Sequence, residues 1–145
     1  MISNREVINS RPNYCFSDFV QACRETLSGK HVSVGLENWV HKDAYNDFNL
    51  TTKSQILEFI TAGGLENMEF VNSTHYRISN EFPPPICDAY TFSSGSICGY
   101  ISIFYSQQNQ RWIIKSLHRC RKRDETDFAL AFRKAGMLND EKNEE

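Results

Sequence analysis

Apolar and polar residues alternate most regularly in the second half of the chain, and this alternation predicts an antiparallel sheet. The runs from Ile97 to Ser106 and from Arg111 to Arg119 are rich in β-branched and aromatic residues at a period of two, as half-buried strands are. Four polar residues at 107–110 separate the runs and indicate a hairpin turn. A second turn at 93–96 adds the run from Ile86 to Phe92. The sequence therefore predicts a meander of three strands.

Three stretches in the first half of the chain have apolar residues at helical spacing instead. The first begins at Ser17, which suits the N-cap position, and ends at Gly29. The second runs from Leu36 to Asp47. The third starts after Thr51 or Thr52 and stops at a pair of glycines. We expect three helices ahead of the meander.

Two further elements complete the expected fold. The run from Met68 to Ser79 is strand-like and leads through three prolines into the meander, and a last helix is expected from Asp124. Helices followed by consecutive strands are typical of the α+β class. We therefore predict one α+β domain over the whole chain, with N-terminal helices packed on a three- to four-stranded antiparallel sheet, and with a C-terminal helix. Residues 1–13 are expected to form a loose arm and residues 139–145 a disordered acidic tail.

Composition places the chain among folded proteins without a membrane span. Hydrophobic residues make up 40% of it, and no apolar run approaches the roughly 20 residues that a spanning helix needs. A secretory leader is not apparent, so a cytoplasmic location is expected. The five cysteines are odd in number and form no C-x-x-C pair, which favours reduced thiols over a disulfide framework.

Positive charge is concentrated at the end of the meander, although the net charge of the chain is −2. No acidic residue occurs between positions 111 and 123. A local basic strip attracts a polyanion such as RNA, or an acidic partner, because charges within about 10 Å set the local field. The alternative is a solvated edge strand without a partner. The strip comprises Arg111, Lys115, Arg119, Arg121, Lys122 and Arg123.

The register of the last hairpin decides which side chains meet on the free face of the sheet. With a two-residue turn, Lys115 and Leu117 lie on the same face as Tyr100, opposite the core face of Ile101. A shift by one residue places His118 opposite Tyr100 but turns Lys115 toward the core. Burial of an unpaired ammonium costs several kcal/mol. The sequence therefore favours the first register, unless the strand is bulged.

These polar side chains are of the kinds that cleave RNA without a metal. Such cleavage needs a base for the ribose 2′-OH, an acid for the leaving oxygen and positive charge for the phosphate. A histidine pKa near 6.5 suits the acid or base role. Tyrosine can bind a phosphate or stack on a base. The four histidines have no metal-ligand spacing and no cofactor motif occurs, so no metal and no cofactor are predicted.

The meander also resembles a known family. Asp88-Ala89-Tyr90, Gly99-Tyr100 and Ser116-Leu117-His118 are similar in order and spacing to motifs of the motility quorum-sensing regulator toxins, within the RelE/colicin-like group of small ribonucleases. The resemblance covers roughly residues 20 to 119. It implies a metal-independent endoribonuclease of toxin–antitoxin type, with RNA as substrate and an antitoxin or cognate inhibitor as protein partner.

The resemblance suggests roles for individual residues. Tyr100 falls at the family's active tyrosine, and His118 falls at its strand-end lysine with Lys115 three residues before it. Two other family positions carry different side chains here, one of them close to His75. Our hypothesis is that His118 and His75 share acid and base duties, Lys115 and Arg119 hold the phosphate and Tyr100 orients it. The predicted RNA-binding residues are Arg111, Arg119, Arg121, Lys122 and Arg123.

Two other classes of function fit the same sequence. The first is a non-enzymatic binding protein of immunity, antitoxin-like or regulatory type, which docks a macromolecular partner on the exposed strand and the basic strip. The second is a small-ligand domain with a pocket between helices and sheet. Neither has a diagnostic motif, because function depends on a site rather than on a fold class.

Overall fold

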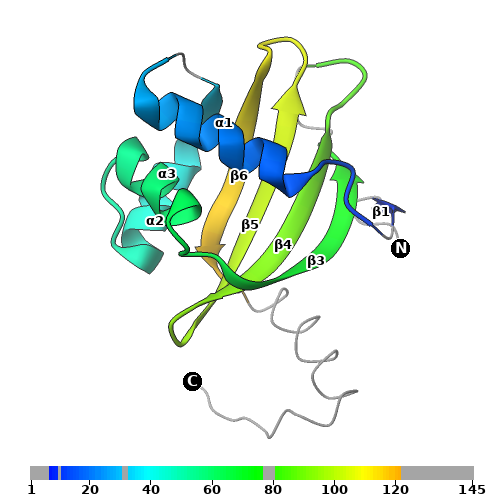
Figure 1. The fold of residues 1–145 in the computed structure, drawn as a ribbon. Helices are drawn as coiled ribbons and strands as arrows, with labels where there is room; N and C mark the ends of the chain where they lie inside the picture. The colour runs from blue at the N-terminus through cyan, green and yellow to red at the C-terminus, as the bar shows by residue number, and fades with distance from the viewer. Residues whose placement is uncertain (1–6, 10, 31–32, 77–80, 122–145) are drawn as a thin grey trace, which may run out of the picture.

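In the described part of the chain, the computed structural model has three helices that pack on one face of a six-stranded sheet (Figure 1). The structure describes residues 7–9, 11–30, 33–76 and 81–121. Along the described chain the elements are β1 Val7–Asn9, α1 Phe16–Ser28, β2 Val34–Leu36, α2 Asn38–Phe48, α3 Lys53–Thr61, β3 Glu66–His75, β4 Ile86–Ser94, β5 Ile97–Ser106 and β6 Arg111–Arg119. The strand order in the sheet is β1-β3-β4-β5-β6-β2.

The predicted α+β class is confirmed, but the sheet is larger than expected. Strands β4 to β6 form the predicted antiparallel meander, and β3, the predicted strand before the prolines, pairs antiparallel with β4. At one edge β1 adds an antiparallel strand beside β3, within the stretch that was expected to be a loose arm. At the other edge β2 pairs parallel with β6. The sheet is therefore mixed rather than wholly antiparallel. The predicted C-terminal helix from Asp124 and the tail at 139–145 lie outside the described residues.

The helix ends follow local capping chemistry in part. Gly29, at φ 83°, ends α1 as predicted, but the helix begins at Phe16 with Cys15 rather than Ser17 as N-cap. Helix α2 begins two residues later than predicted because Leu36 belongs to β2. The Thr52 side chain caps α3 by accepting a hydrogen bond from the Gln55 amide at 3.1 Å, as a threonine N-cap does.

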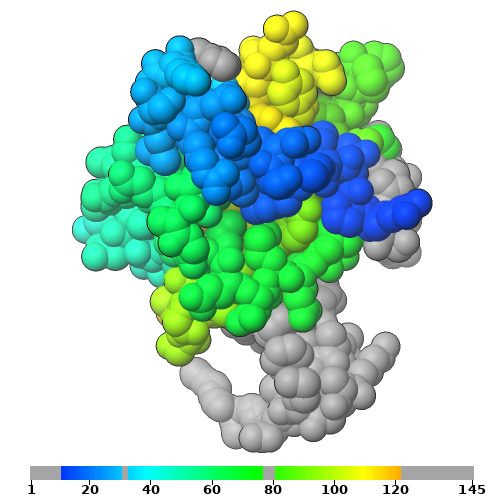
Figure 2. All heavy atoms as spheres, in the orientation of Figure 1, coloured from blue at the N-terminus to red at the C-terminus, as the bar shows by residue number. Residues whose placement is uncertain are grey.

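The core lies between the helices and the sheet face that they cover. Figure 2 shows α1 lying across this face of the molecule. Removal of the apolar side chains of the core from water is the main stabilising contribution to the fold. The fully buried members include Phe19 of α1, Ile56 and Leu57 of α3, and Ile101, Ile103, Ile114 and Leu117 of the sheet.

A buried carboxylate ties the segment before α1 to the sheet. Asp88 has no exposed surface. Its two oxygens accept hydrogen bonds from the amides of Asn13 at 3.0 Å and Tyr14 at 2.8 Å, and from the Ser73 hydroxyl at 2.6 Å. A buried carboxylate is tolerated when hydrogen bonds replace its water. This arrangement fixes Tyr14 beside β4 and β5.

The β5–β6 hairpin contains a bulge that combines the two registers considered above. Near the turn the predicted register holds, with Tyr105 opposite Trp112 and Ile103 opposite Ile114. Beyond it Ser102 pairs with Ser116 and Ile101 with Leu117. Lys115 is the extra residue between the two registers. The predicted placement of Leu117 on the free face is therefore wrong, because the bulge lets Leu117 enter the core without burying the Lys115 ammonium there.

The shifted register also pairs two cysteines. The Cys120 amide donates to the Cys98 carbonyl at 2.9 Å, and a disulfide joins the two side chains with their Cα atoms 5.5 Å apart. The expectation of reduced thiols is wrong for this pair, whereas Cys15, Cys23 and Cys87 are free. The separation of 22 residues between Cys98 and Cys120 matches no motif, so only the strand register brings these two cysteines together.

Candidate functional site

Two of the predicted catalytic residues are in contact. The Tyr100 and His118 rings stack with centroids 5.1 Å apart and planes at 18°. Both alternate with core residues along their strands, so they lie on the sheet face away from the helices. Tyr100 is 7% and His118 5% exposed, and His118 Nδ1 lies 2.7 Å from the Arg119 carbonyl oxygen. The pair is therefore packed inside the protein and lines neither of the two hollows described below.

The other two predicted catalytic residues lie apart from this pair. Lys115 Nζ lies over the Tyr76 ring, 5.3 Å from its centroid. His75 pairs with Ile86 at the start of β4. Tyr100 pairs with Thr91, five positions further along the same strand, which is about 16 Å at the usual rise per residue. The structure does not bring His75 and His118 to one place.

The predicted RNA-binding residues divide between the two ends of β6. Arg111 begins the strand and Arg119 ends it, so their Cα atoms are about 26 Å apart along the strand. Near the second end, Arg121 forms an ion pair of 3.0 Å with Asp43 of α2. Asp47 of the same helix accepts a hydrogen bond from the Arg119 amide at 2.9 Å. Lys122 and Arg123 lie outside the described residues.

A different part of the molecule is hollowed. Two adjoining cavities, which share Glu81 and Gln108 as walls, lie beside the β5–β6 turn and the segment before β4. Hollow A has a volume of about 550 Å³ and is lined by Asn13, Tyr14, Glu81, Phe82, Pro83, Pro84, Pro85, Ile86, Tyr105, Gln107 and Gln108. Hollow B has a volume of about 470 Å³ and is lined by Leu36, Glu37, Trp39, Tyr76, Glu81, Phe104, Ser106, Gln108, Asn109, Arg111 and Ile113. We call the two hollows together the groove.

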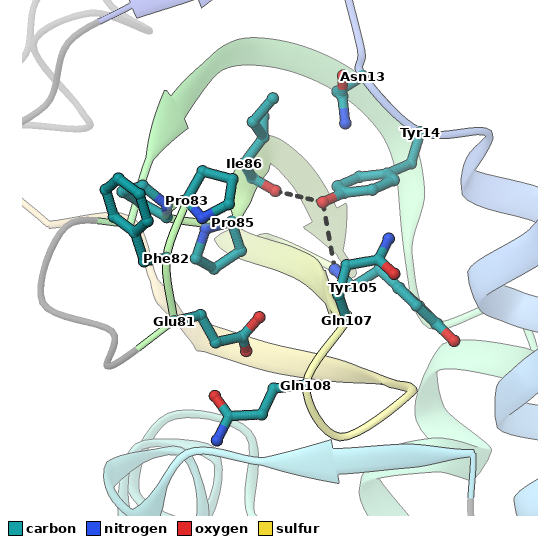
Figure 3. Close-up of a pocket in the computed structure, with 11 residues that line it drawn as sticks. Asn13, Tyr14, Glu81, Phe82, Pro83, Pro85, Ile86, Tyr105, Gln107 and Gln108 are labelled. Atoms are coloured by element: carbon teal, nitrogen blue, oxygen red, sulfur yellow. Dashed lines mark hydrogen bonds between the residues drawn. The ribbon is translucent and has the colours of Figure 1, made fainter.

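Hollow A has apolar walls and an amide rim (Figure 3). Its Tyr14 hydroxyl donates to the Ile86 carbonyl at 2.6 Å and accepts from the Tyr105 amide at 3.3 Å. Burial raises the pKa of Tyr14 above its usual value, so this ring is a neutral, fixed wall. Phe82 stands at the edge of the hollow with 94% of its surface exposed.

Hollow B is polar by comparison. Glu37 Oε2 accepts a hydrogen bond of 2.9 Å from the Tyr76 hydroxyl. Burial, followed by this bond and the Glu37 charge, raises the pKa of Tyr76. Glu81 Oε2 accepts from the Ser106 hydroxyl at 2.5 Å. Trp39 is 47% exposed and donates its indole N–H to the Lys115 carbonyl at 2.7 Å.

Arg111 adds a positive charge to the lining of hollow B. Its Nε is buried and has no hydrogen-bond partner in the described part of the chain. Buried polar atoms normally have a partner. This N–H is covered by protein atoms, so the contribution of Arg111 to hollow B is the positive charge of its guanidinium.

Arg111 is the one groove residue among the site residues that the sequence predicts. Glu37 and Trp39 bracket the start of α2, Tyr76 follows β3, and Glu81 precedes the prolines. No motif joins positions so far apart in the chain. The one available signal was Phe82 next to three prolines, because a stiff, extended connection holds an apolar ring at the surface.

Comparisons with known proteins do not add a family. No protein-family model, no curated protein sequence and no solved structure matches this chain. In the described residues no cluster of three or more His, Cys, Asp or Glu side chains could hold a metal ion. No helix there is long and apolar enough to cross a membrane.

Proposed function

We propose that the protein is a non-enzymatic binding protein that docks a segment of a protein partner in the groove. The observation that carries this proposal is the pair of adjoining hollows, of about 550 and 470 Å³, with an exposed aromatic residue on each. Phe82 borders hollow A and Trp39 borders hollow B. Aromatic side chains beside a concave surface are typical anchors of protein interfaces.

The placement of the predicted catalytic residues favours this function over RNA cleavage. An acid or base must come within hydrogen-bond reach of the proton that it transfers. Tyr100 and His118 are buried, and His75 is about 16 Å along the sheet from Tyr100. Arg111 and Arg119 are at opposite ends of β6. A phosphodiester cannot contact all of these groups at once.

A metal-independent endoribonuclease is the second candidate, and the contact between Tyr100 and His118 favours it. These two residues match the positions that the family resemblance makes catalytic. Their stacking shows that the strand register brings the two predicted groups together. A small local rearrangement would then have to expose them to RNA.

The docking function is tested with peptides that bind the full-length protein. Peptides selected from a displayed random library are measured by fluorescence anisotropy against the wild type and the Phe82→Ala and Tyr45→Ala variants. Tyr45 is a matched control because it is 55% exposed but lines neither hollow. Loss of an interface anchor costs about 1 to 2 kcal/mol or more, so we expect Phe82→Ala to weaken binding about 5- to 30-fold and Tyr45→Ala to leave it unchanged. Equal effects of the two substitutions would contradict docking in the groove.

The ribonuclease candidate is tested on the same preparations. Wild-type protein and the His118→Ala variant are incubated with total RNA in EDTA, with thermal melting as a check that the variant is folded. We expect no cleavage by either protein. Cleavage by the wild type that a folded His118→Ala variant lacks would replace the docking proposal with the ribonuclease.

A further inference from the structure

We propose that hollow B takes a basic side chain, lysine or arginine, from the docked segment. This inference rests on the proposed docking function and specifies the chemistry of the partner. Hollow B combines a carboxylate with an open indole ring. Hollow A, with its prolines and aromatic rings, suits the apolar neighbour of that basic residue.

Glu37 supplies the negative charge. Its carboxylate is held by the Tyr76 hydroxyl, and this neutral donor positions the charge without cancelling it. No lysine or arginine of the described chain forms an ion pair with Glu37. A cation that enters hollow B therefore meets a fixed, partly buried carboxylate, where the local dielectric is lower than in water and attraction is stronger.

Trp39 supplies an aromatic face. The hydrogen bond from its indole N–H to the Lys115 carbonyl fixes the ring, while nearly half of the side chain stays exposed. Tryptophan is the best aromatic partner for a cation. The neighbouring Tyr76 ring already has a cation over it, the Lys115 ammonium, so this corner of the protein accommodates such contacts.

Arg111 and Lys115 limit the gain from a cationic occupant. Because Arg111 and Lys115 are positive and close to hollow B, we expect a fivefold to tenfold preference for a cationic side chain rather than a larger one.

The test uses two probes of nearly the same shape, one cationic and one neutral; the neutral probe also has an oxygen in place of one guanidinium nitrogen. N-acetyl-arginine amide and N-acetyl-citrulline amide are titrated into ¹⁵N-labelled full-length protein, and the indole N–H signal of Trp39 is followed by NMR. Trp39→Phe assigns that signal against the second tryptophan, Trp112. We expect a saturable shift with the arginine probe and a five- to tenfold weaker response to citrulline. Equal responses, or no shift up to the solubility limit, would overturn the inference.

Two variants connect the response to hollow B. Glu37→Gln keeps an oxygen that accepts from Tyr76 but removes the charge, and should reduce the arginine response about fivefold. Glu66→Gln removes an exposed acid on β3 and should leave it unchanged. An arginine response that Glu37→Gln does not reduce would refute the role of hollow B.

The outcomes for docking and for charge recognition are separable. In one outcome, the selected peptides need Phe82 for binding but bind equally well after their basic residues are changed to citrulline. This outcome would leave docking in the groove intact and refute the inference that hollow B takes a basic side chain. In the opposite outcome, binding of the selected peptides does not depend on Phe82, while binding of the arginine probe depends on Glu37. This outcome would refute docking in the groove and leave hollow B as a site for a small cationic ligand.

Discussion

Removal of the disulfide should destabilise the protein by an amount set by the chain that it closes. Cys98 and Cys120 are 22 residues apart. For such a loop, the chain-entropy relation gives a stabilisation of about 3 kcal/mol at 25 °C. The hydrogen bond between the Cys120 amide and the Cys98 carbonyl does not depend on the side chains, so the native strand pairing should survive the substitution. The loss therefore comes mainly from the larger conformational freedom of the unfolded chain.

The assay is urea unfolding of the wild type and of the Cys98→Ala, Cys120→Ala and double variants, with and without a reductant. Each single substitution should lower the free energy of unfolding by about 3 kcal/mol. The double substitution should lower it by little more, because either change breaks the same disulfide bond. With a slope of about 2 kcal/mol per M, the midpoint should fall by about 1.5 M. Reductant should lower the urea midpoint of the wild type but leave the midpoints of the three disulfide variants unchanged. Cys15→Ala, which removes an exposed free thiol, is the matched control.

Two results would refute this reasoning. One is a wild-type midpoint that does not respond to reductant. The other is additive losses in the double variant, which would mean that each cysteine stabilises the fold through its own packing. A thiol titration of the unfolded, unreduced protein provides an independent check. It should find the three free thiols of Cys15, Cys23 and Cys87 rather than five.

Two further predictions concern buried titratable groups. Asp88→Ala should lower the free energy of unfolding in urea by about 3 kcal/mol, because it leaves the part-buried backbone amides of Asn13 and Tyr14 and the buried Ser73 hydroxyl without their acceptor. A loss below about 1 kcal/mol would show that water replaces the carboxylate. Burial raises the pKa of the Cys23 and Cys87 thiols from 9.0 to about 12. The unfolded chain therefore releases these protons at lower pH than the folded one, and stability that is complete below pH 9 should be lost as pH rises toward 12. Cys23→Ala should reduce that slope by about 1.4 kcal/mol per pH unit, and an unchanged slope would contradict it.

Local sequence was sufficient for the elements that rely on local rules. The bounds of β5 and β6 follow from alternation with a period of two and from the polar turn between them. The end of α1 at Gly29 and the start of α3 after Thr52 follow from capping chemistry that involves only neighbours in the chain. Each of these choices is settled within a few residues, so one sequence determines it.

Tertiary structure alone decided the features that depend on distant partners. The predicted register keeps the Lys115 ammonium out of the core by holding one pairing along the whole hairpin. The bulge instead changes the pairing at Lys115, so that Leu117 enters the core while the Lys115 ammonium stays out of it. The position of the bulge depends on what packs against each of these side chains. The three residues of β2 are too few to show a period and become a strand only beside β6.

The groove belongs to the same group of features. Its walls come from the segment before α1, the start of α2, the end of β3, the proline segment and the β5–β6 turn. Cys98 and Cys120 likewise meet only through the shifted register. Periodicity along a sequence specifies which face of an element is buried, but it contains no information on which exposed side chains of different elements converge. The sequence by itself therefore determined the class of fold, and the packing of the elements determined the candidate site.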